Sequence, residues 1–253
     1  MQGVVYRRFG LKIKTIWFAK ERLSAEEQGC DIVFYRQSVN NFAPDNKLFN
    51  SLITDLSLGE DQLFQMLDKN CRYEVRRAQR DAIHTYAYDS DFLKANSKDL
   101  NNFIEAYNEF AASKSLGRCN SFAIRSYIEK DMFILTIAKQ EECPLVYHAY
   151  ISTTERVRLW YSASLFRSET DQKARANIGR ANRLLHWQDL LYFKERGIRE
   201  YDWGGYSDAE ETRNITIFKR QFGGTPETSY HISIPCSFKG RLALTALGLL
   251  GKS

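Results

Sequence analysis

Apolar and polar residues alternate along several short stretches, which is the period of a β-strand with one buried face. This alternation predicts a strand at residues 83–88, and strands are also expected at residues 31–37, 51–56, 198–203 and 228–234. Three more stretches follow one another closely, at residues 132–140, 144–153 and 156–164. Because only short turns separate them, these three strands are expected to form an antiparallel meander.

Apolar residues at intervals of three and four predict helices at residues 61–70, 72–82, 97–114, 121–130, 178–196 and 212–222. Ser57 and Glu60 have the spacing of a capping box ahead of the first of these helices. The polar segment 165–176 is expected to be a loop before the longest helix. This order of elements predicts an α+β fold in which helices flank a mixed central sheet.

The composition is that of a soluble globular protein, with 253 residues of which 43% are hydrophobic and 26% charged. The net charge of +5 permits a phosphate-bearing partner without requiring one. Five cysteines lie far apart in the sequence and the four histidines are scattered, so we expect a reduced, cytoplasmic protein with no metal site. No apolar run is long enough to span a bilayer, and the apolar end of the chain predicts at most peripheral membrane contact.

Candidate chemistry is concentrated between residues 201 and 224, where two glycine pairs bracket a short predicted helix. Gly204 and Gly205 can turn the backbone with positive φ, or they can let a ligand approach the main chain closely. Asp202 either orients or deprotonates an attacking ammonium, or accepts backbone hydrogen bonds in the turn. Lys219 is either a solvated helix residue or a cation that faces a ligand.

The segments 159–164, 182–205 and 217–224 resemble the FemAB/FemX branch of the GNAT acyltransferases, and so does the basic segment 55–83. This resemblance implies a GNAT-like fold with three parts. Residues 1–95 would form a truncated first GNAT-like half, residues 96–236 a complete catalytic domain, and residues 237–253 a C-terminal tail.

The resemblance also implies catalytic roles for Lys219, Phe218 and Asp202, with Lys219 facing the reaction centre. A cation there stabilises the oxyanion that forms when an amine attacks an ester or thioester carbonyl. Residues expected to bind the substrate are Tyr161, Ser164, Trp203, Gly204, Gly205, Arg76 and Arg77. For the two arginines the alternative is a solvated helix face paired with neighbouring acids.

GNAT enzymes hold the pyrophosphate of coenzyme A at a helix N-terminus, and the segment 174–182 matches that loop in part. Donor binding is therefore expected at Arg175, Gly179 and Arg180. The match leaves two donors open, acyl-coenzyme A and aminoacyl-tRNA.

These observations together predict an N-acyltransferase that moves an acyl or aminoacyl group to an amine, without a metal. The expected acceptor is a cell-envelope precursor, either a peptidoglycan peptide or an amino sugar, and no DNA partner is expected. One alternative is an acyl-coenzyme A-dependent N-acetyltransferase that acts on a small or glycan amine. The other is a non-catalytic GNAT-like module that binds tRNA or a nucleotide.

Overall fold

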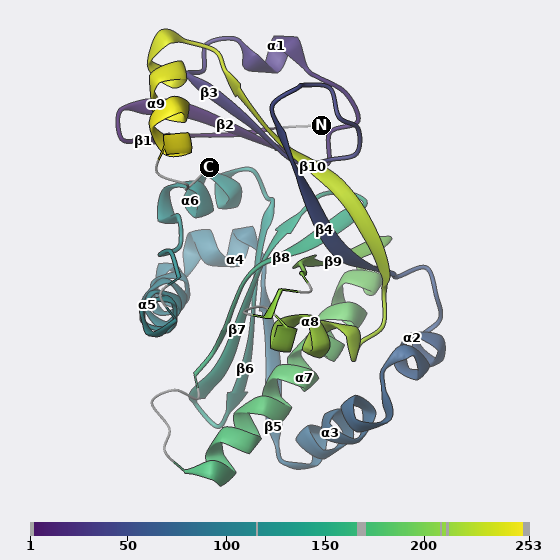
Figure 1. The fold of residues 1–253 in the computed structure, drawn as a ribbon. Helices are drawn as coiled ribbons and strands as arrows, with labels where there is room; N and C mark the ends of the chain where they lie inside the picture. The colour runs from purple at the N-terminus through teal and green to yellow at the C-terminus, as the bar shows by residue number, and fades with distance from the viewer. Residues whose placement is uncertain (1–2, 115, 166–170, 208, 211–212, 250–253) are drawn as a thin grey trace. The chain divides into compact units, whose positions relative to one another are not determined.

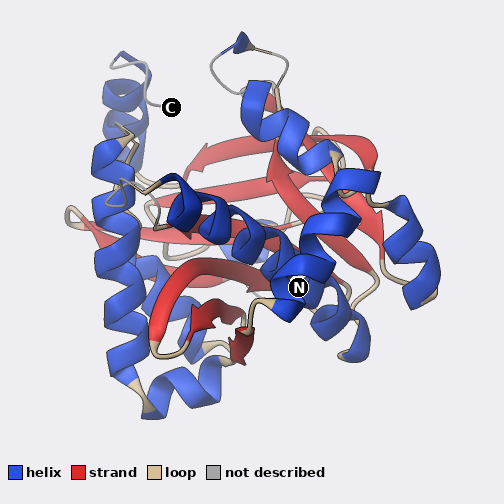
Figure 2. Ribbon diagram, turned by 90° about the horizontal axis from the view of Figure 1, so that it is seen from below, coloured by secondary structure: helices blue, strands red, loops and turns tan. Residues whose placement is uncertain are grey.

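The structure is a computed structural model, and it describes residues 3–114, 116–165, 171–207, 209–210 and 213–249. The strands within these residues are β1 (Val4–Arg8), β2 (Leu11–Trp17), β3 (Ile32–Ser38), β4 (Asn46–Asp55), β5 (Ile83–Tyr88), β6 (Phe133–Gln140), β7 (Cys143–Ser152), β8 (Arg156–Ser164), β9 (Glu200–Gly205) and β10 (Thr225–Pro235). The helices are α1 (Ser24–Glu27), α2 (Glu60–Met66), α3 (Lys69–Arg80), α4 (Ser90–Ala95), α5 (Ser97–Ser113), α6 (Ser121–Glu129), α7 (Gln172–Glu195), α8 (Arg213–Arg220) and α9 (Phe238–Leu249). This mixture of helices with a mixed sheet (Figure 1, Figure 2) confirms the predicted α+β class.

The chain divides into two compact units. The first contains Met1–Ser51, Phe122–Ser126 and Glu227–Ser253, and the second contains Leu52–Ser121 and Tyr127–Pro226. The boundary expected after residue 95 falls between α4 and α5, inside the second unit. That residues 1–95 derive from a truncated GNAT-like half stays a prediction.

The sheet of the second unit contains the predicted meander. β5 pairs antiparallel with β6, β6 with β7, and β7 with β8, whereas β8 and β9 are parallel. The tight turn between β6 and β7 places Glu141 in the left-handed region, with φ at 54°. The parallel pair of β8 and β9 matters for the site. Parallel neighbours need a long crossover connection, and here α7 provides it between the two strands.

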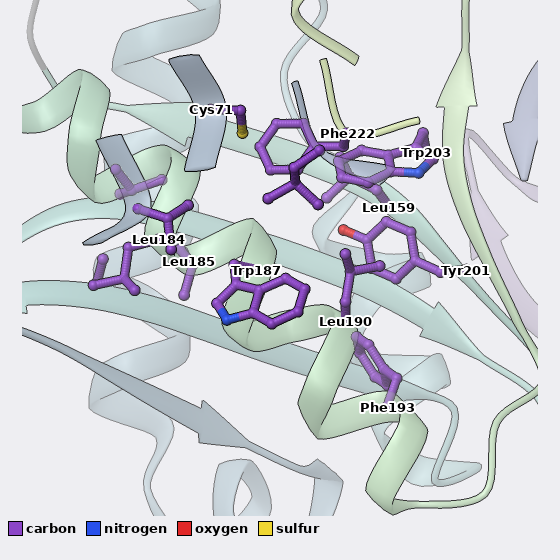
Figure 3. Close-up of a cluster of buried hydrophobic side chains, with 14 of the residues drawn as sticks. Cys71, Leu159, Leu184, Leu185, Trp187, Leu190, Phe193, Tyr201, Trp203 and Phe222 are labelled. Atoms are coloured by element: carbon purple, nitrogen blue, oxygen red, sulfur yellow. The ribbon is translucent and has the colours of Figure 1, made fainter. Parts of the chain in front are cut away.

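The core of the second unit lies between this sheet and α7. Trp203 of β9 is fully buried, and its ring centroid lies 4.7 Å from that of Tyr201 and 4.7 Å from that of Phe222. Leu184, Leu185, Leu190 and Phe193 face this cluster from α7 (Figure 3). The aromatic residues around the 201–224 stretch therefore anchor β9 and the segment after α8 to the long helix.

The first unit has its own group of paired strands and its own core. β1 and β2 form an antiparallel hairpin, β2 and β3 are parallel, and β10 pairs antiparallel with β3. Ile16, Tyr35 and Ile232 are fully buried and form the centre of the core. No described helix combines the length and the apolar composition that crossing a bilayer requires.

The longest helix starts earlier than the sequence predicts. Asp171 is its N-cap, and its carboxylate accepts hydrogen bonds from the N–H groups of Lys173 and Ala174 at 3.1 and 3.2 Å. Residues 172–177 are good helix formers but mostly polar, so apolar periodicity did not reveal them. The predicted start at residue 178 is therefore wrong, and Gly179 and Arg180 lie inside the helix and not in a loop before it.

The predicted capping box is also displaced. Helix α2 begins at Glu60, and the Gln62 side chain accepts a hydrogen bond of 2.9 Å from the N–H of Gly59. Ser57 instead donates its N–H to Asp55 in a short turn at the end of β4. Only one of the two bonds of the motif is present here, because Gly59 has no side chain to accept the second, and the Ser57–Glu60 interpretation is therefore wrong.

We predict that Gly179→Ala raises the free energy of unfolding by roughly 0.5–1 kcal/mol, because alanine is the better residue inside a helix. An added methyl group at this position would have only the Arg183 guanidinium near it, at 4.0 Å. Gly197→Ala is the matched control: this residue follows the helix with φ at 77°, so the same change should cost about 1 kcal/mol. Urea unfolding measures both changes, and a loss of stability in Gly179→Ala would contradict the helical position.

Candidate active site

The candidate site lies where the two parallel strands of the second unit part. β8 and β9 pair only from Arg156 to Arg158, opposite Glu200 to Asp202, within the described chain. Both strands continue past this point, β8 to Ser164 and β9 to Gly205. Beyond this last pair, the described residues of the two strands form no ladder hydrogen bonds with each other. A ligand that inserts between the strands would need such uncommitted main-chain groups.

Gly204 controls the path of β9 at the point of separation. Its φ is 73°, a conformation that residues with a side chain rarely adopt. A Cβ atom at this position would lie 3.0 Å from the carbonyl oxygen of Leu159 and 3.8 Å from Nζ of Lys219. The glycine therefore allows β9 to pack closely against β8 and against the Lys219 side chain.

Lys219 reaches this point from the last turn of α8. Its Nζ donates a hydrogen bond of 2.6 Å to the carbonyl oxygen of Gly205. The pKa of Lys219 is lowered to about 8, mainly by burial and also by the nearby charge of Arg158, while the charge of Asp202 acts in the opposite direction. The structure thus brings Lys219, Gly204 and Gly205 together, as the sequence spacing suggested, and gives the amine an altered basicity.

Asp202 has the structural role that was one of its two interpretations. It is fully buried; one oxygen accepts hydrogen bonds from Arg156 at 2.7 and 3.2 Å, and the other accepts the N–H of Gly204 at 2.7 Å. The carboxylate therefore fixes the turn at Gly204 and offsets the charge of Arg156. The role of Asp202 in orienting an attacking ammonium stays a prediction.

Two aromatic residues predicted for the site belong to the packing around it. The indole N–H of the fully buried Trp203 donates to Oγ1 of Thr54 at 2.9 Å, and the contact of Trp203 with substrate stays a prediction. Phe218 packs against the ring of His186 at 5.6 Å, with the Arg183 guanidinium 5.2 Å from its own centroid. Phe218 holds α8 in place, and this contact positions Lys219.

Tyr161 and Ser164 lie on β8 beyond its separation from β9. The Tyr161 hydroxyl accepts a hydrogen bond of 3.1 Å from the N–H of Asn120, and its ring lies 4.6 Å from that of Tyr107. Ser164 is largely buried and lies opposite Val146 of β7. Tyr161 is partly exposed, and its role in binding an acceptor stays a prediction.

The arginines predicted to bind phosphate fall into different places. Arg77 and Arg180 line a polar cavity of about 420 Å³ together with Lys173, near the start of α7. Arg180 is largely buried there, and its Nε donates to Asp81 at 3.0 Å. The two remaining arginines point elsewhere: Arg76 lies 5.0 Å over the ring of Phe64, and Arg175 is exposed on α7.

A buried polar network behind the site was not predicted from the sequence. His148 bonds to Asp189 at 2.7 Å, and the hydroxyl of Tyr150 bridges Asp189 at 2.6 Å and Tyr201 at 2.7 Å. The Tyr201 hydroxyl is in turn 3.3 Å from Nδ1 of His186. The spacing of His186 and Asp189, three residues apart on one helix face, is the signal that could have pointed to this network.

His186 links the network to the site. Burial lowers the pKa of His186 well below its usual value, and the charges of His148, Lys219 and Arg183 act in the same direction. The imidazole is therefore neutral. His148, His186 and Asp189 also bring potential metal-ligand atoms within 4.8 Å of one another, but both ring nitrogens of His148 are already hydrogen-bonded, to Asp189 and to Asn182.

Comparison with known proteins gives no match to a family model and no match among curated sequences. Solved structures do match: one is FemX, with a TM-score of 0.59 over 91% of this chain and 84% of the other, at 13% sequence identity. The chain has the FemX-like GNAT fold.

Two further structures extend the FemX-like comparison. One is the C-terminal domain of a protein assigned as a lysylphosphatidylglycerol synthetase of Agrobacterium fabrum, with a TM-score of 0.58 over 99% of this chain and 86% of the other, at 10% identity. The second is L-PGS from Bacillus licheniformis, with a TM-score of 0.55 over 96% and 84% of the two chains, at 13% identity. At these identities the likeness establishes the fold alone.

We predict that raising the pH stabilises the unsubstituted protein relative to Lys219→Met. With a folded pKa of about 8 and an unfolded pKa near the ordinary 10.5, the unfolded chain binds more protons between these values, so stability rises with pH there. Urea unfolding at about pH 7 and about pH 10 measures the difference, and Lys130→Met at an exposed position is the matched control. A Lys219→Met difference that does not change with pH would contradict the altered pKa.

Proposed function

We propose that the protein is an N-acyltransferase that forms an amide between an activated acyl or aminoacyl group and an amine. The observation that carries the proposal is Lys219, a partly buried amine with a pKa of about 8, held by Gly205 where β8 and β9 part. A partly desolvated cation is electrostatically stronger than one in water, because the surrounding medium screens it less. The FemX-like fold supports an acyl-transfer reaction over other uses of such an amine.

In the proposed reaction the lone pair of the acceptor amine attacks the carbonyl carbon of the donor. The carbonyl oxygen then becomes an oxyanion, and the N–H groups of Lys219 donate to it; one such donor is typically worth roughly 3–4 kcal/mol. The attack forms the C–N bond. Collapse of the intermediate then re-forms the carbonyl and breaks the C–O or C–S bond to the donor, whose oxygen or sulfur leaves with the bonding electrons, and the amine loses its extra proton to Lys219 or to solvent. Arg156 pairs with the buried Asp202 and lies 3.5 Å from Glu200, and Arg158 is a further cation close enough to lower the pKa of Lys219.

Lys219 can also take part in the movement of the proton. An amine with a pKa of about 8 is close enough to neutrality to accept a proton from the attacking ammonium, which a lysine of ordinary pKa does poorly. The two roles fall at different stages of the reaction and use the same nitrogen. Asp202 and Phe218 serve this nitrogen indirectly, through the turn at Gly204 and the packing of α8.

The donor is proposed to be an acyl-coenzyme A or an aminoacyl-tRNA, both of which carry phosphates. Support comes from the cavity at the start of α7, where Arg77, Lys173 and Arg180 offer cations. The acceptor is proposed to be an amine of a cell-envelope precursor, a peptidoglycan peptide or an amino sugar, on the strength of the FemX-like resemblance. An acyl-coenzyme A enzyme for small or glycan amines and a non-catalytic tRNA- or nucleotide-binding module are the competing outcomes of the test.

We predict that Lys219→Ala lowers the turnover rate about 10²–10³-fold while donor binding stays within about twofold. The assay incubates the full chain with a panel of acyl-coenzyme A thioesters and charged tRNAs, and measures donor loss in the presence of amine-bearing envelope precursors. Lys130→Ala, which removes an exposed lysine of the same charge, is the control and should keep full activity.

Thermal unfolding in the presence of each donor separates the alternatives, since a ligand at 100 times its dissociation constant adds about 2.7 kcal/mol of stability. Stabilisation by a donor together with Lys219-dependent turnover supports the transferase. Binding of tRNA or nucleotide with no turnover on any acceptor supports the non-catalytic module. Turnover that is unchanged in Lys219→Ala removes this residue from the mechanism.

A further inference from the structure

Among the exposed large apolar side chains of the first unit, three lie on the β1–β2 hairpin and on α9. Phe9, at the tip of the β1–β2 hairpin, is 88% exposed, and Phe238, at the start of α9, is 75% exposed. Leu242, one helical turn after Phe238, is 57% exposed. Aromatic and aliphatic side chains of this size are costly to leave in water, so a group of them on one unit calls for a partner.

Basic residues surround these apolar side chains. Arg7, Arg8 and Lys12 lie on the hairpin, and Lys239 and Arg241 lie on α9. Arg7 is directly opposite Lys12 across the strand pair, an arrangement of like charges that weakens a sheet. None of these five cations forms an ion pair with another residue in the described parts of the chain.

Asp31 joins the hairpin and α9 into one surface. Its carboxylate accepts a hydrogen bond from the N–H of Lys12 at 2.8 Å and another from the hydroxyl of Ser237 at 2.6 Å. These two bonds lower the pKa of Asp31, and the charges of Lys239 and Arg7 add to the effect, so both cations lie near the same carboxylate.

The start of α9 is held closely against this residue. The N–H of Cys236 donates to the carbonyl oxygen of Asp31 at 2.9 Å. A Cβ atom at Gly240 would lie 1.9 Å from that oxygen, so only glycine allows the contact. Asp31 thus keeps the hairpin tip and the first turns of α9 adjacent, while its own charge is committed to these bonds.

We propose that this basic–aromatic surface, formed by Arg7, Arg8, Phe9, Lys12, Phe238, Lys239, Arg241 and Leu242, docks on a membrane that carries anionic lipids. The cations complement anionic headgroups, and the exposed phenylalanines and leucine enter the boundary between headgroups and acyl chains. A nucleic acid would use the same cations but would leave Leu242 and the outer face of Phe238 in water. The apolar residues therefore favour a lipid surface over RNA.

The test uses the full chain and sedimentation with vesicles of phosphatidylcholine alone or mixed with phosphatidylglycerol. We expect binding to the mixed vesicles only, and a weaker interaction as salt is raised. Arg8→Glu combined with Arg241→Glu should weaken this binding at least about 25-fold, roughly fivefold for each cation lost. Both substitutions avoid the residues that act on Asp31, so the anchor of α9 is retained.

A second pair of variants separates insertion from charge. Phe9→Asn combined with Phe238→Ser should weaken vesicle binding about tenfold or more with an unchanged dependence on salt, and asparagine tolerates the φ of 51° at position 9. The control Leu48→Ser removes a side chain that is 68% exposed in the same unit, and Lys130→Glu reverses an exposed charge in the other unit; both should bind as the unsubstituted protein does.

Thermal unfolding of each variant verifies that it is folded. Equal binding to both kinds of vesicle, no binding to either, or loss of binding in the two controls would overturn the proposal. Binding to an RNA oligonucleotide that the charge variant abolishes, in the absence of vesicle binding, would assign the surface to nucleic acid instead.

Discussion

The hydrogen bond from Lys219 to the carbonyl oxygen of Gly205 is the interaction on which the rest of the site depends. It brings a cation into a partly buried position, where loss of hydration and the neighbouring Arg158 disfavour its charge. Burial of the Lys219 charge costs free energy of folding, and a lysine on the last turn of a surface helix could avoid that cost by extending into water. In the proposed reaction this cost is offset when an oxyanion forms beside the lysine. The desolvated cation is already in position before the reaction begins, so no reorganisation is needed at that step.

Several parts of the fold cooperate to hold that nitrogen in place. Gly204 allows β9 to turn within contact distance of β8, and Asp202 fixes that turn by accepting the glycine N–H while it pairs with Arg156. Phe218 packs α8 against the aromatic core around Trp203. Ladder pairing between the described residues of β8 and β9 ends at Arg158 and Asp202, just before this turn.

The residue pattern alone was enough for the α+β class and for the meander, because three short segments rich in apolar and β-branched residues follow one another with only short turns between them. The grouping of Lys219 with Gly204 and Gly205 could also be predicted, since the residues are near in sequence and belong to one motif. The start of α7 could not, because a polar first two turns capped by Asp171 carry no apolar signal. The alternation in Leu11–Trp17 did carry a signal for β2, and it was missed.

Other parts of the site depend on contacts between distant segments, which one sequence does not contain. The bond between Trp203 and Thr54 joins residues 149 positions apart, and the sequence alone did not indicate that this tryptophan is fully buried. Likewise, the partnership of Arg156 with Asp202 spans 46 positions. Burial at this level alters both pKa and accessibility, so residue type and spacing alone could not assign the roles of these side chains.

The most direct measurement is the titration of the Lys219 side chain itself, by nuclear magnetic resonance of protein with labelled lysine. The signal is assigned from its absence in Lys219→Arg. A midpoint at about 8, separate from those of the exposed lysines, is the result expected of a desolvated amine between β8 and β9. A midpoint near the ordinary 10.5, moving together with the surface lysines, would show that the nitrogen is hydrated and would contradict its role in the proposed chemistry.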